Sequence, residues 1–108
     1  MTPEEIFPQI VEATKTLQSD PDNIEALKRR AQLLHAAGMP AEALADLDRV
    51  IDTLHATDAA TLQLRGSIRM QQGDKDGAFA DLQALVKLKP DLLQHLTGEY
   101  ASKKSGHC

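Results

Sequence analysis

The stretch RAQLLHAAGMPAEALADL (residues 30–47) returns 35 residues later as RGSIRMQQGDKDGAFADL (residues 65–82). Each copy reads as two amphipathic helices joined at a glycine, Gly38 in the first and Gly73 in the second. Glycine suits this point because it tolerates the left-handed backbone that ends a helix. A repeat of this length predicts stacked helical hairpins, since one hairpin cannot bury its apolar face alone. Stacked hairpins usually present a surface to partners and seldom carry chemistry.

Composition limits the class of protein and of partner. The 108 residues are 42% hydrophobic and 3% aromatic, so the core would rest on Leu, Ile, Val and Ala. A formal net charge of −4 disfavours nucleic acid and anionic membranes as partners. No apolar run approaches the roughly 20 residues of a membrane span, and Glu4 and Glu5 stand where a signal peptide carries positive charge. The single cysteine, Cys108, allows no internal disulfide, and the cytoplasm is the expected compartment.

Capping and turn residues predict about six helices. Thr2 is expected to cap a first helix, with Glu5 completing a capping box. Pro40 is expected to open the third helix and Thr57 or Asp58 to cap the fourth. The apolar faces predicted for the first and fifth helices are Ile6, Ile10, Ala13 and Leu17, and Ala78, Leu82, Leu85 and Val86.

The two copies resemble the tetratricopeptide repeat in spacing and residue size together, over residues 4–92. Small residues stand where the two helices of a hairpin cross, and large apolar residues flank them. These positions are Ala31, Ala43, Gly66 and Ala78 for the small residues, and Leu27, Leu47, Val50, Leu62, Leu82 and Leu85 for the large ones. Arg30, Arg65 and Arg69 depart from the pattern at usually apolar positions, and the junction near His55 is one residue longer. We interpret both departures as local variation.

The resemblance implies an all-α fold in which antiparallel helical hairpins stack as a short right-handed superhelix. We expect half a repeat at residues 1–23 and full repeats at residues 24–58 and 59–92. A capping helix at residues 91–101 and a flexible tail at residues 102–108 would follow. The alternative is an amphipathic bundle without superhelical order.

The resemblance also implies a concave groove, lined by the first helix of each hairpin, that binds a peptide or protein segment. Carried over to this sequence, the candidate groove residues are Glu25, Lys28, Arg29, Gln32, His35, Gln63, Leu64, Ser67, Met70 and Gln71. Lys28 and Arg29 would make one end of the groove positive, while Leu64 and Met70 would make the other end apolar. A partner with an acidic segment and one apolar anchor would complement this groove. The alternative is that Lys28 and Arg29 only form a solvated face.

The two ends of the array supply a rival hypothesis, because a short stack has proportionally large terminal faces. The candidate interface residues are Phe7, Ile10, Val11, Leu93, Leu96 and Tyr100. An exposed apolar patch on a small protein usually marks an interface. The rival function is therefore a structural module that forms homo-oligomers through its terminal helices. The alternative is that these side chains only cap the outer hairpins.

Catalytic and metal-binding patterns are missing from the sequence. The four histidines, His35, His55, His95 and His107, never stand four residues apart, and Cys108 lies in the predicted tail. The glycine-containing turn at residues 73–77 lacks the ending that a phosphate-binding loop requires. We therefore expect no enzymatic activity, no metal and no cofactor.

Overall fold

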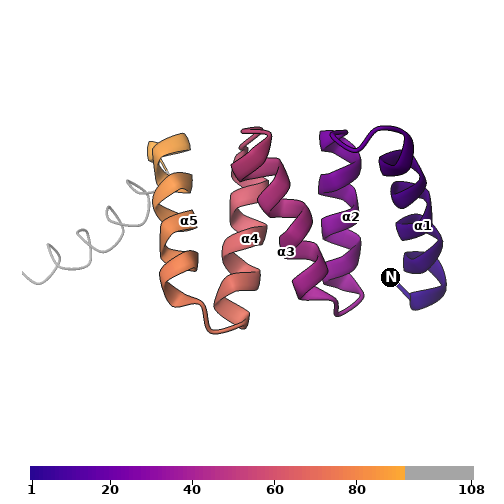
Figure 1. Cartoon of the computed structure of the whole chain (residues 1–108). Helices are drawn as coiled ribbons and strands as arrows, with labels where there is room; N and C mark the ends of the chain where they lie inside the picture. Colours follow the sequence, from indigo (N-terminus) through magenta and orange to yellow (C-terminus); the bar gives the residue numbers. More distant parts are fainter. Residues whose placement is uncertain (92–108) are drawn as a thin grey trace, which may run out of the picture.

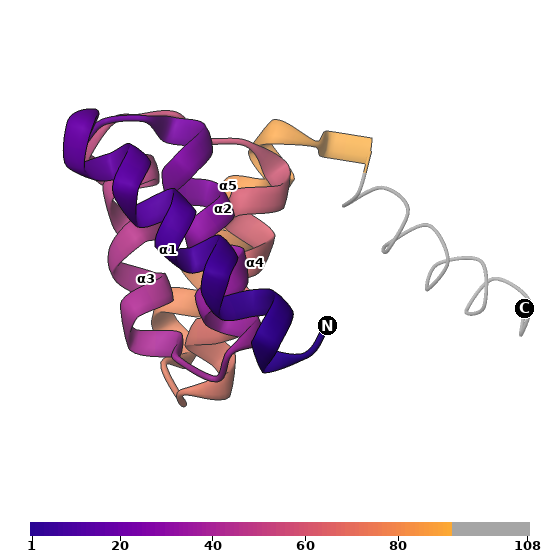
Figure 2. The same ribbon diagram turned by 90° about the vertical axis from the view of Figure 1, so that its right-hand side faces the viewer.

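The computed structural model describes residues 1–91, and within them every regular element is helical. The elements are α1 (Pro3–Ser19), α2 (Ile24–Ala36), α3 (Pro40–Asp48), the π-helix η1 (Arg49–Thr53), α4 (Ala59–Gln71) and α5 (Lys75–Leu88). They stand side by side in chain order, with α1 at one end of the row and α5 at the other (Figure 1). Figure 2 looks along this row from its α1 end. The prediction of an all-α fold is confirmed; the expected capping helix, residues 91–101, and the tail, residues 102–108, lie essentially outside the described residues.

Side-chain caps begin three of the helices. The carboxamide of Asn23 accepts a hydrogen bond from the backbone N–H of the third residue of α2, at 2.9 Å. Asp58 and Asp74 do the same for α4 and α5, at 2.7 and 2.9 Å. Thr2 precedes α1 as predicted, but its hydroxyl donates to the Glu5 carboxylate rather than capping a backbone N–H. Each cap satisfies a donor that the helix itself cannot, which fixes where the helix starts.

Glycines end the first helix of each hairpin. Gly38 and Gly73 have φ angles of +78° and +83°, in the left-handed region that favours glycine. The next residue in each case, Met39 or Asp74, donates its backbone N–H to the carbonyl five residues earlier. This arrangement satisfies carbonyls left over at the helix end and turns the chain back on itself.

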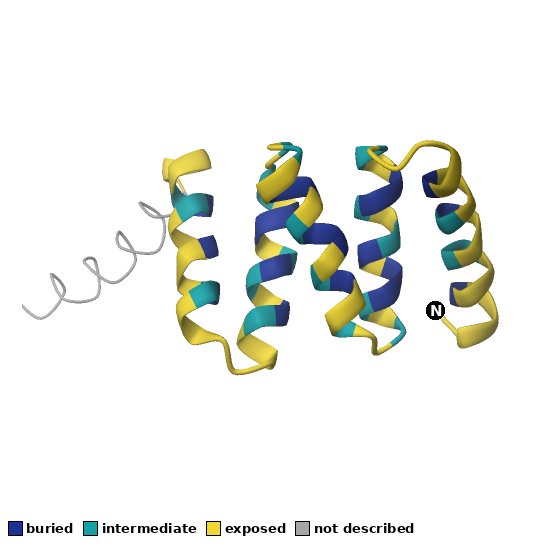
Figure 3. Cartoon of the chain, in the orientation of Figure 1, coloured by how far each residue is buried: buried dark blue, intermediate teal, exposed yellow. Residues whose placement is uncertain are grey.

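The core consists of three apolar clusters, and each cluster draws side chains from three neighbouring elements. One cluster, from α2, α3 and α4, consists of Ala31, Leu34, Ala43, Leu47 and Ile68. A second, from α1, α2 and η1, consists of Leu17, Ala26, Leu27 and Val50. The third, from η1, α4 and α5, consists of Ile51, Leu62 and Leu85. Figure 3 shows the buried residues on the sides where helices face one another, and exposed residues on the outer sides of α1 and α5.

Leu82 does not belong to the buried face predicted for α5. It is 45% exposed, whereas Leu47, at the same place in the preceding hairpin, is 1% exposed. The cause is the neighbouring element: α4 contributes Ile68 to the cluster that covers Leu47, while no hairpin follows α5 within residues 1–91. Val86, predicted for the same face, is half-buried.

The arginines that depart from the repeat pattern are paired with aspartates inside each hairpin. Arg30 donates from Nε and Nη2 to the two carboxylate oxygens of Asp46, at 2.8 and 2.7 Å. Arg65 forms the matching pair with Asp81, and its Nη2 donates to Oδ1 at 2.7 Å. Two parallel donors hold a carboxylate in one orientation, so each pair locks the first helix of its hairpin to the second.

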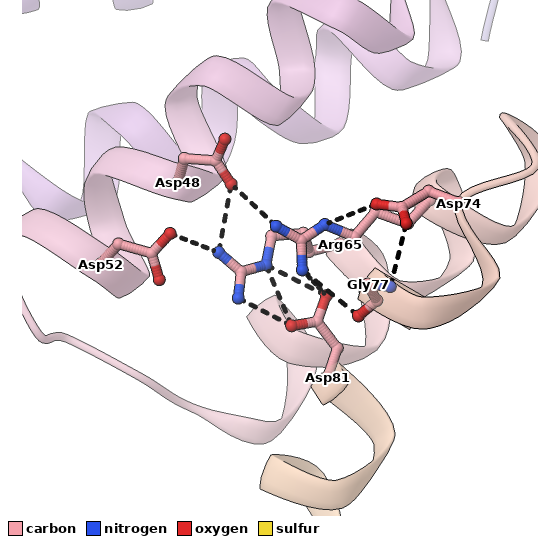
Figure 4. A network of polar contacts seen from close by, with 7 residues as sticks. Asp48, Asp52, Arg65, Asp74, Gly77 and Asp81 are labelled. Carbon is pink, nitrogen blue, oxygen red and sulfur yellow. Dashed lines mark hydrogen bonds and ion pairs between the residues drawn. The ribbon is translucent and has the colours of Figure 1, made fainter. Parts of the chain in front are cut away.

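The second pair extends into a network that joins the two hairpins. Nη1 of Arg65 donates to Asp48 at 3.1 Å and to Asp52 at 3.0 Å, and both aspartates come from the preceding hairpin (Figure 4). Arg69 adds a second guanidinium, which donates to Asp81 at 3.2 Å. Burial opposes the charge of Arg65, but the hydrogen bonds and charges of Asp81 and Asp52 outweigh it and raise its pKa above the ordinary value.

The junction after α3 absorbs its extra residue in a π-helix. The backbone N–H of Leu54 donates to the carbonyl of Arg49, five residues earlier, and that of Ala56 donates to Val50, six residues earlier. A π-turn holds one more residue than an α-turn, so the next hairpin keeps its place in the row. His55 ends this segment with a φ of +53°, the position that Gly38 and Gly73 occupy after their helices.

We predict that replacing Asp81 with alanine lowers the free energy of unfolding by about 3 kcal/mol, because the guanidinium of Arg65 stays buried without its main partner. Urea denaturation followed by circular dichroism measures this loss. Asp52→Ala is the matched control: Asp52 contacts the same guanidinium but its side chain is 60% exposed, so the loss should stay below about 1 kcal/mol. Equal losses in the two variants would show that the buried pair does not stabilise the hairpin.

We predict that His55→Gly raises the free energy of unfolding by about 0.5–1 kcal/mol, because glycine adopts positive φ without the steric cost of a Cβ atom. Thermal and urea unfolding measure the change. His55→Ala removes the imidazole but keeps the Cβ atom, so it should bring no gain. A gain of the same size in both variants would assign the effect to the imidazole instead of the backbone.

Candidate functional site

The predicted groove residues lie on two neighbouring helices. Glu25, Lys28, Arg29, Gln32 and His35 belong to α2, and Gln63, Leu64, Ser67, Met70 and Gln71 belong to α4. Two contacts tie these helices together, one near each end: Lys28 with Asp58 at 2.6 Å, and His35 Nε2 with Gln71 Oε1 at 3.4 Å. All ten are exposed or half-buried, but Glu25 and Lys28 form an ion pair and Leu64 packs against the core. We call the other seven the α2–α4 face: Arg29, Gln32, His35, Gln63, Ser67, Met70 and Gln71.

The predicted positive end of this face is weaker than the sequence suggests. The ammonium of Lys28 donates to Asp58 at 2.6 Å and lies 3.7 Å from Glu25. The hydrogen bond with Asp58 raises the pKa of Lys28. The bonds that Asp58 accepts from Lys28 and Thr61 lower its own pKa to about 2, so both groups are charged at neutral pH. The positive charge of Lys28 is therefore balanced by carboxylates of the same chain.

Arg29 carries the remaining positive charge at this end. It is exposed, and its Nη2 donates to the uncharged carboxamide of Gln9 at 2.8 Å. Among residues 1–91 it forms no ion pair with a carboxylate. The expected pair of basic groups is thus reduced to one guanidinium, held near α1 by a neutral partner.

The predicted apolar end continues into a pocket between α4 and α5. Leu64 is half-buried against the cluster that contains Leu47, whereas Met70 is exposed. The pocket has a volume of about 360 Å³, and Gln63, Ser67 and Met70 form its α4 side. The α5 side is formed by Ala78, Leu82 and Leu85 together with Asp81, whose carboxylate is held by Arg65. Three predicted groove residues therefore border an apolar recess at the α5 end of the row.

The predicted oligomer interface is described only at its α1 end. Phe7 and Val11 lie four residues apart and each is about half exposed, so they form an exposed apolar pair on α1. Ile10 is half-buried and packs against the cluster that contains Leu47, so it is largely committed to the core. Leu93, Leu96 and Tyr100 lie outside the described residues.

Two features of the site were not predicted from the sequence. The first is the pair of salt bridges, Arg30 with Asp46 and Arg65 with Asp81. The signal was present, because in both copies an arginine precedes an aspartate by 16 residues. The second is the exposure of Phe79 and Leu82 on α5. Within residues 1–91 no hairpin follows α5 to cover them.

Neither a metal centre nor a membrane span is found in the described part of the chain. No group of three or more His, Cys, Asp or Glu side chains among residues 1–91 is placed to hold a metal ion. No helix within the same residues combines the length and the apolar character needed to cross a bilayer.

Sequence and structure comparisons identify known proteins that are similar to this chain. No protein-family model matches the chain. Over 74 residues, 68% of its length, the chain is 39% identical to DnaJ homolog subfamily C member 3 of Bos taurus and of Homo sapiens. It spans only 14% of the length of these relatives. The crystal structure of MamA superposes with a TM-score of 0.71 at 25% identity, over 85% of this chain and 58% of MamA.

The relatives agree with the structure on the nature of the repeat. The DnaJ relative contains tetratricopeptide repeats, and MamA has the corresponding helical fold. In the described residues, α1 is followed by two helical hairpins, the first made of α2 with α3 and η1 and the second of α4 with α5. These findings support the tetratricopeptide-repeat family for this chain, and its all-helical structure matches the helical fold of MamA.

Proposed function

We propose that the chain is a non-catalytic adaptor that binds a segment of a partner protein along the α2–α4 face. The observation that carries this proposal is the pocket of about 360 Å³ that this face borders at the α5 end. An apolar floor with polar side chains at the rim is the usual make-up of a site for one anchoring side chain. The similarity to the DnaJ relatives covers 14% of their length and supports a shared repeat unit.

The binding energy would come mainly from the apolar end. A Leu- or Phe-sized side chain buried against Met70 and Leu82 would contribute roughly 1.5–3 kcal/mol. The carboxamides of Gln63, at the pocket, and of Gln71, elsewhere on the α2–α4 face, would donate hydrogen bonds to the backbone of the bound segment and accept them from it. Arg29 would attract an acidic residue at the other end, which affects the association rate more than the affinity because it is exposed to solvent.

This proposal can be tested with peptides selected from a random phage library against the whole chain. Met70→Asp should weaken a selected peptide at least about tenfold, since it places a charge beside the apolar pocket. Lys15→Asp, an exposed change on α1, should alter affinity less than about twofold. Calorimetry gives both dissociation constants.

The same peptides test the basic end. For peptides with an acidic residue, Arg29→Glu should slow association at low salt, and the difference should shrink above about 0.5 M salt. Selected peptides that tolerate both Met70→Asp and Arg29→Glu would place binding elsewhere and refute the α2–α4 face as the site.

We propose homo-oligomerisation as the second candidate function, on the observation that Phe7 and Val11 form an exposed apolar pair on α1. The other candidate residues, Leu93, Leu96 and Tyr100, belong to the proposed capping helix and would cover or extend the opposite end. In this case the chain would form dimers or larger assemblies that dissociate on dilution.

We predict that light scattering behind a sizing column separates the two candidates. A mass near 11.8 kDa at all concentrations would refute oligomerisation. A mass of two or more chains that returns to one chain in Phe7→Asp would assign the interface to α1. Lys15→Asp serves again as the matched control, because it changes the charge of the same helix without removing apolar surface.

A further inference from the structure

The two hairpins contain the same arginine site in two different states. Arg30 and Arg65 each use Nε and Nη2 for an aspartate in the second helix of their own hairpin. They differ at Nη1. In Arg65 this group donates to Asp48 and Asp52, at 3.1 and 3.0 Å, whereas in Arg30 its contact is the hydroxyl of Thr14, at 3.4 Å.

The difference arises from the helix that precedes each arginine. Thr14 and Asp48 both lie five residues before the end of their helical segment. Gln18 and Asp52 both lie one residue before that end. The first site thus has a hydroxyl and a carboxamide where the second has two carboxylates. The side chain of Arg30 is accordingly 25% exposed, compared with 7% for Arg65.

A recess of about 300 Å³ opens at the place of the missing carboxylates. The recess contains the Arg30–Asp46 pair and the guanidinium of Arg49, and its other lining residues are Thr14, Leu17, Gln18, Pro21 and Leu27. Asp46 accepts from Nε and Nη2 of Arg30, as Asp81 does from Arg65, so Nη1 is the group that faces the missing carboxylates. None of these side chains belongs to the α2–α4 face. The recess therefore combines hydrogen-bond donors with an apolar wall, which suits a short acidic side chain and its aliphatic stem.

The charges of the first site leave room for one more carboxylate. Around Arg65, Arg69 provides the second guanidinium that lets several aspartates gather. Arg49, from η1, is the second guanidinium that lines the recess with Arg30. Arg49 is paired with Asp22, but both side chains are substantially exposed, at 43% and 60%, and such pairs contribute at most about 1 kcal/mol. Arg49 can therefore exchange or share its partner at little cost.

We propose that the Arg30 recess is a second binding site, which takes an aspartate or glutamate side chain of an acidic protein segment. The incoming carboxylate accepts from Nη1 of Arg30 and from Arg49, in the manner that Asp48 and Asp52 accept from Arg65 within the chain. Its aliphatic stem lies against Leu17 and Leu27. This site is independent of the α2–α4 face and does not require that face to bind anything.

The test uses the whole chain and two blocked peptides, acetyl-Leu-Asp-Glu-Leu-amide and its neutral twin acetyl-Leu-Asn-Gln-Leu-amide. Nitrogen-15 NMR follows the Nε–H signal of Arg30 during each titration at low salt. The acidic peptide should shift this signal with a dissociation constant in the millimolar range, as expected for one or two partly exposed ion pairs. The neutral twin should bind at least about fivefold more weakly.

Gln18→Glu is the deciding variant, because it supplies from α1 the carboxylate that the proposal assigns to the partner. It should weaken the acidic peptide at least about threefold. Gln83→Glu makes the same charge change at an exposed position of α5, outside both proposed sites, and should alter affinity less than about 1.5-fold. The proposal is overturned by equal binding of the two peptides, by an unmoved Arg30 signal, or by equal effects of the two variants. None of these outcomes bears on the Met70→Asp experiment.

Discussion

The buried ion pair of Arg65 with Asp81 is the constraint on which the second hairpin and its junction with the first depend. Arg65 and Asp81 lie where two helices cross, with side chains 7% and 2% exposed, so neither charge can be solvated by water instead. The guanidinium can stay there only if its remaining donors are met, and Asp48 and Asp52 of the preceding hairpin meet them. Satisfying one buried cation thus fixes α4 against α5 and, at the same time, against the end of α3 and η1.

Small residues make this pairing geometrically possible. Ala31 and Ala43 in the first hairpin are fully buried, and Gly66 approaches the Cβ atom of Asp81 so closely that an added methyl group would lie 3.4 Å from it. At such a crossing the two helix backbones come near enough for an arginine on one helix to grip an aspartate on the other. The apolar clusters and the salt bridges are therefore two results of one close approach.

The sequence predicted what depends on local chemistry, and missed what depends on neighbours. Gly38, Gly73 and Asp58 end or begin helices as expected, because turn and cap preferences act within a few residues. The sequence predicts that Lys28 offers a positive charge to a partner, but its ammonium is already paired with the carboxylate of Asp58, 30 residues later. No period or spacing rule links those two positions. The exposure of Leu82 was missed for the same reason: the repeat predicts a buried leucine, but burial requires a following helix to cover it.

Two copies of one unit in a single chain also separate causes that a single site would confound. Leu47 and Leu82 are both leucines at equivalent positions of the repeat, so we attribute their different exposure to the presence or absence of a neighbouring hairpin. Arg30 and Arg65 hold their aspartates in the same way, so the different state of Nη1 traces to Thr14 and Gln18 of α1. Next to Leu82 the open surface is apolar and lies at the α5 end of the described helices. Next to Arg30 it is a recess lined by two guanidinium groups and the carboxylate of Asp46. In each case the other copy of the repeat indicates which group would fill the open surface. Leu47 is covered by an apolar side chain of the next helix, and Arg65 is met by carboxylates.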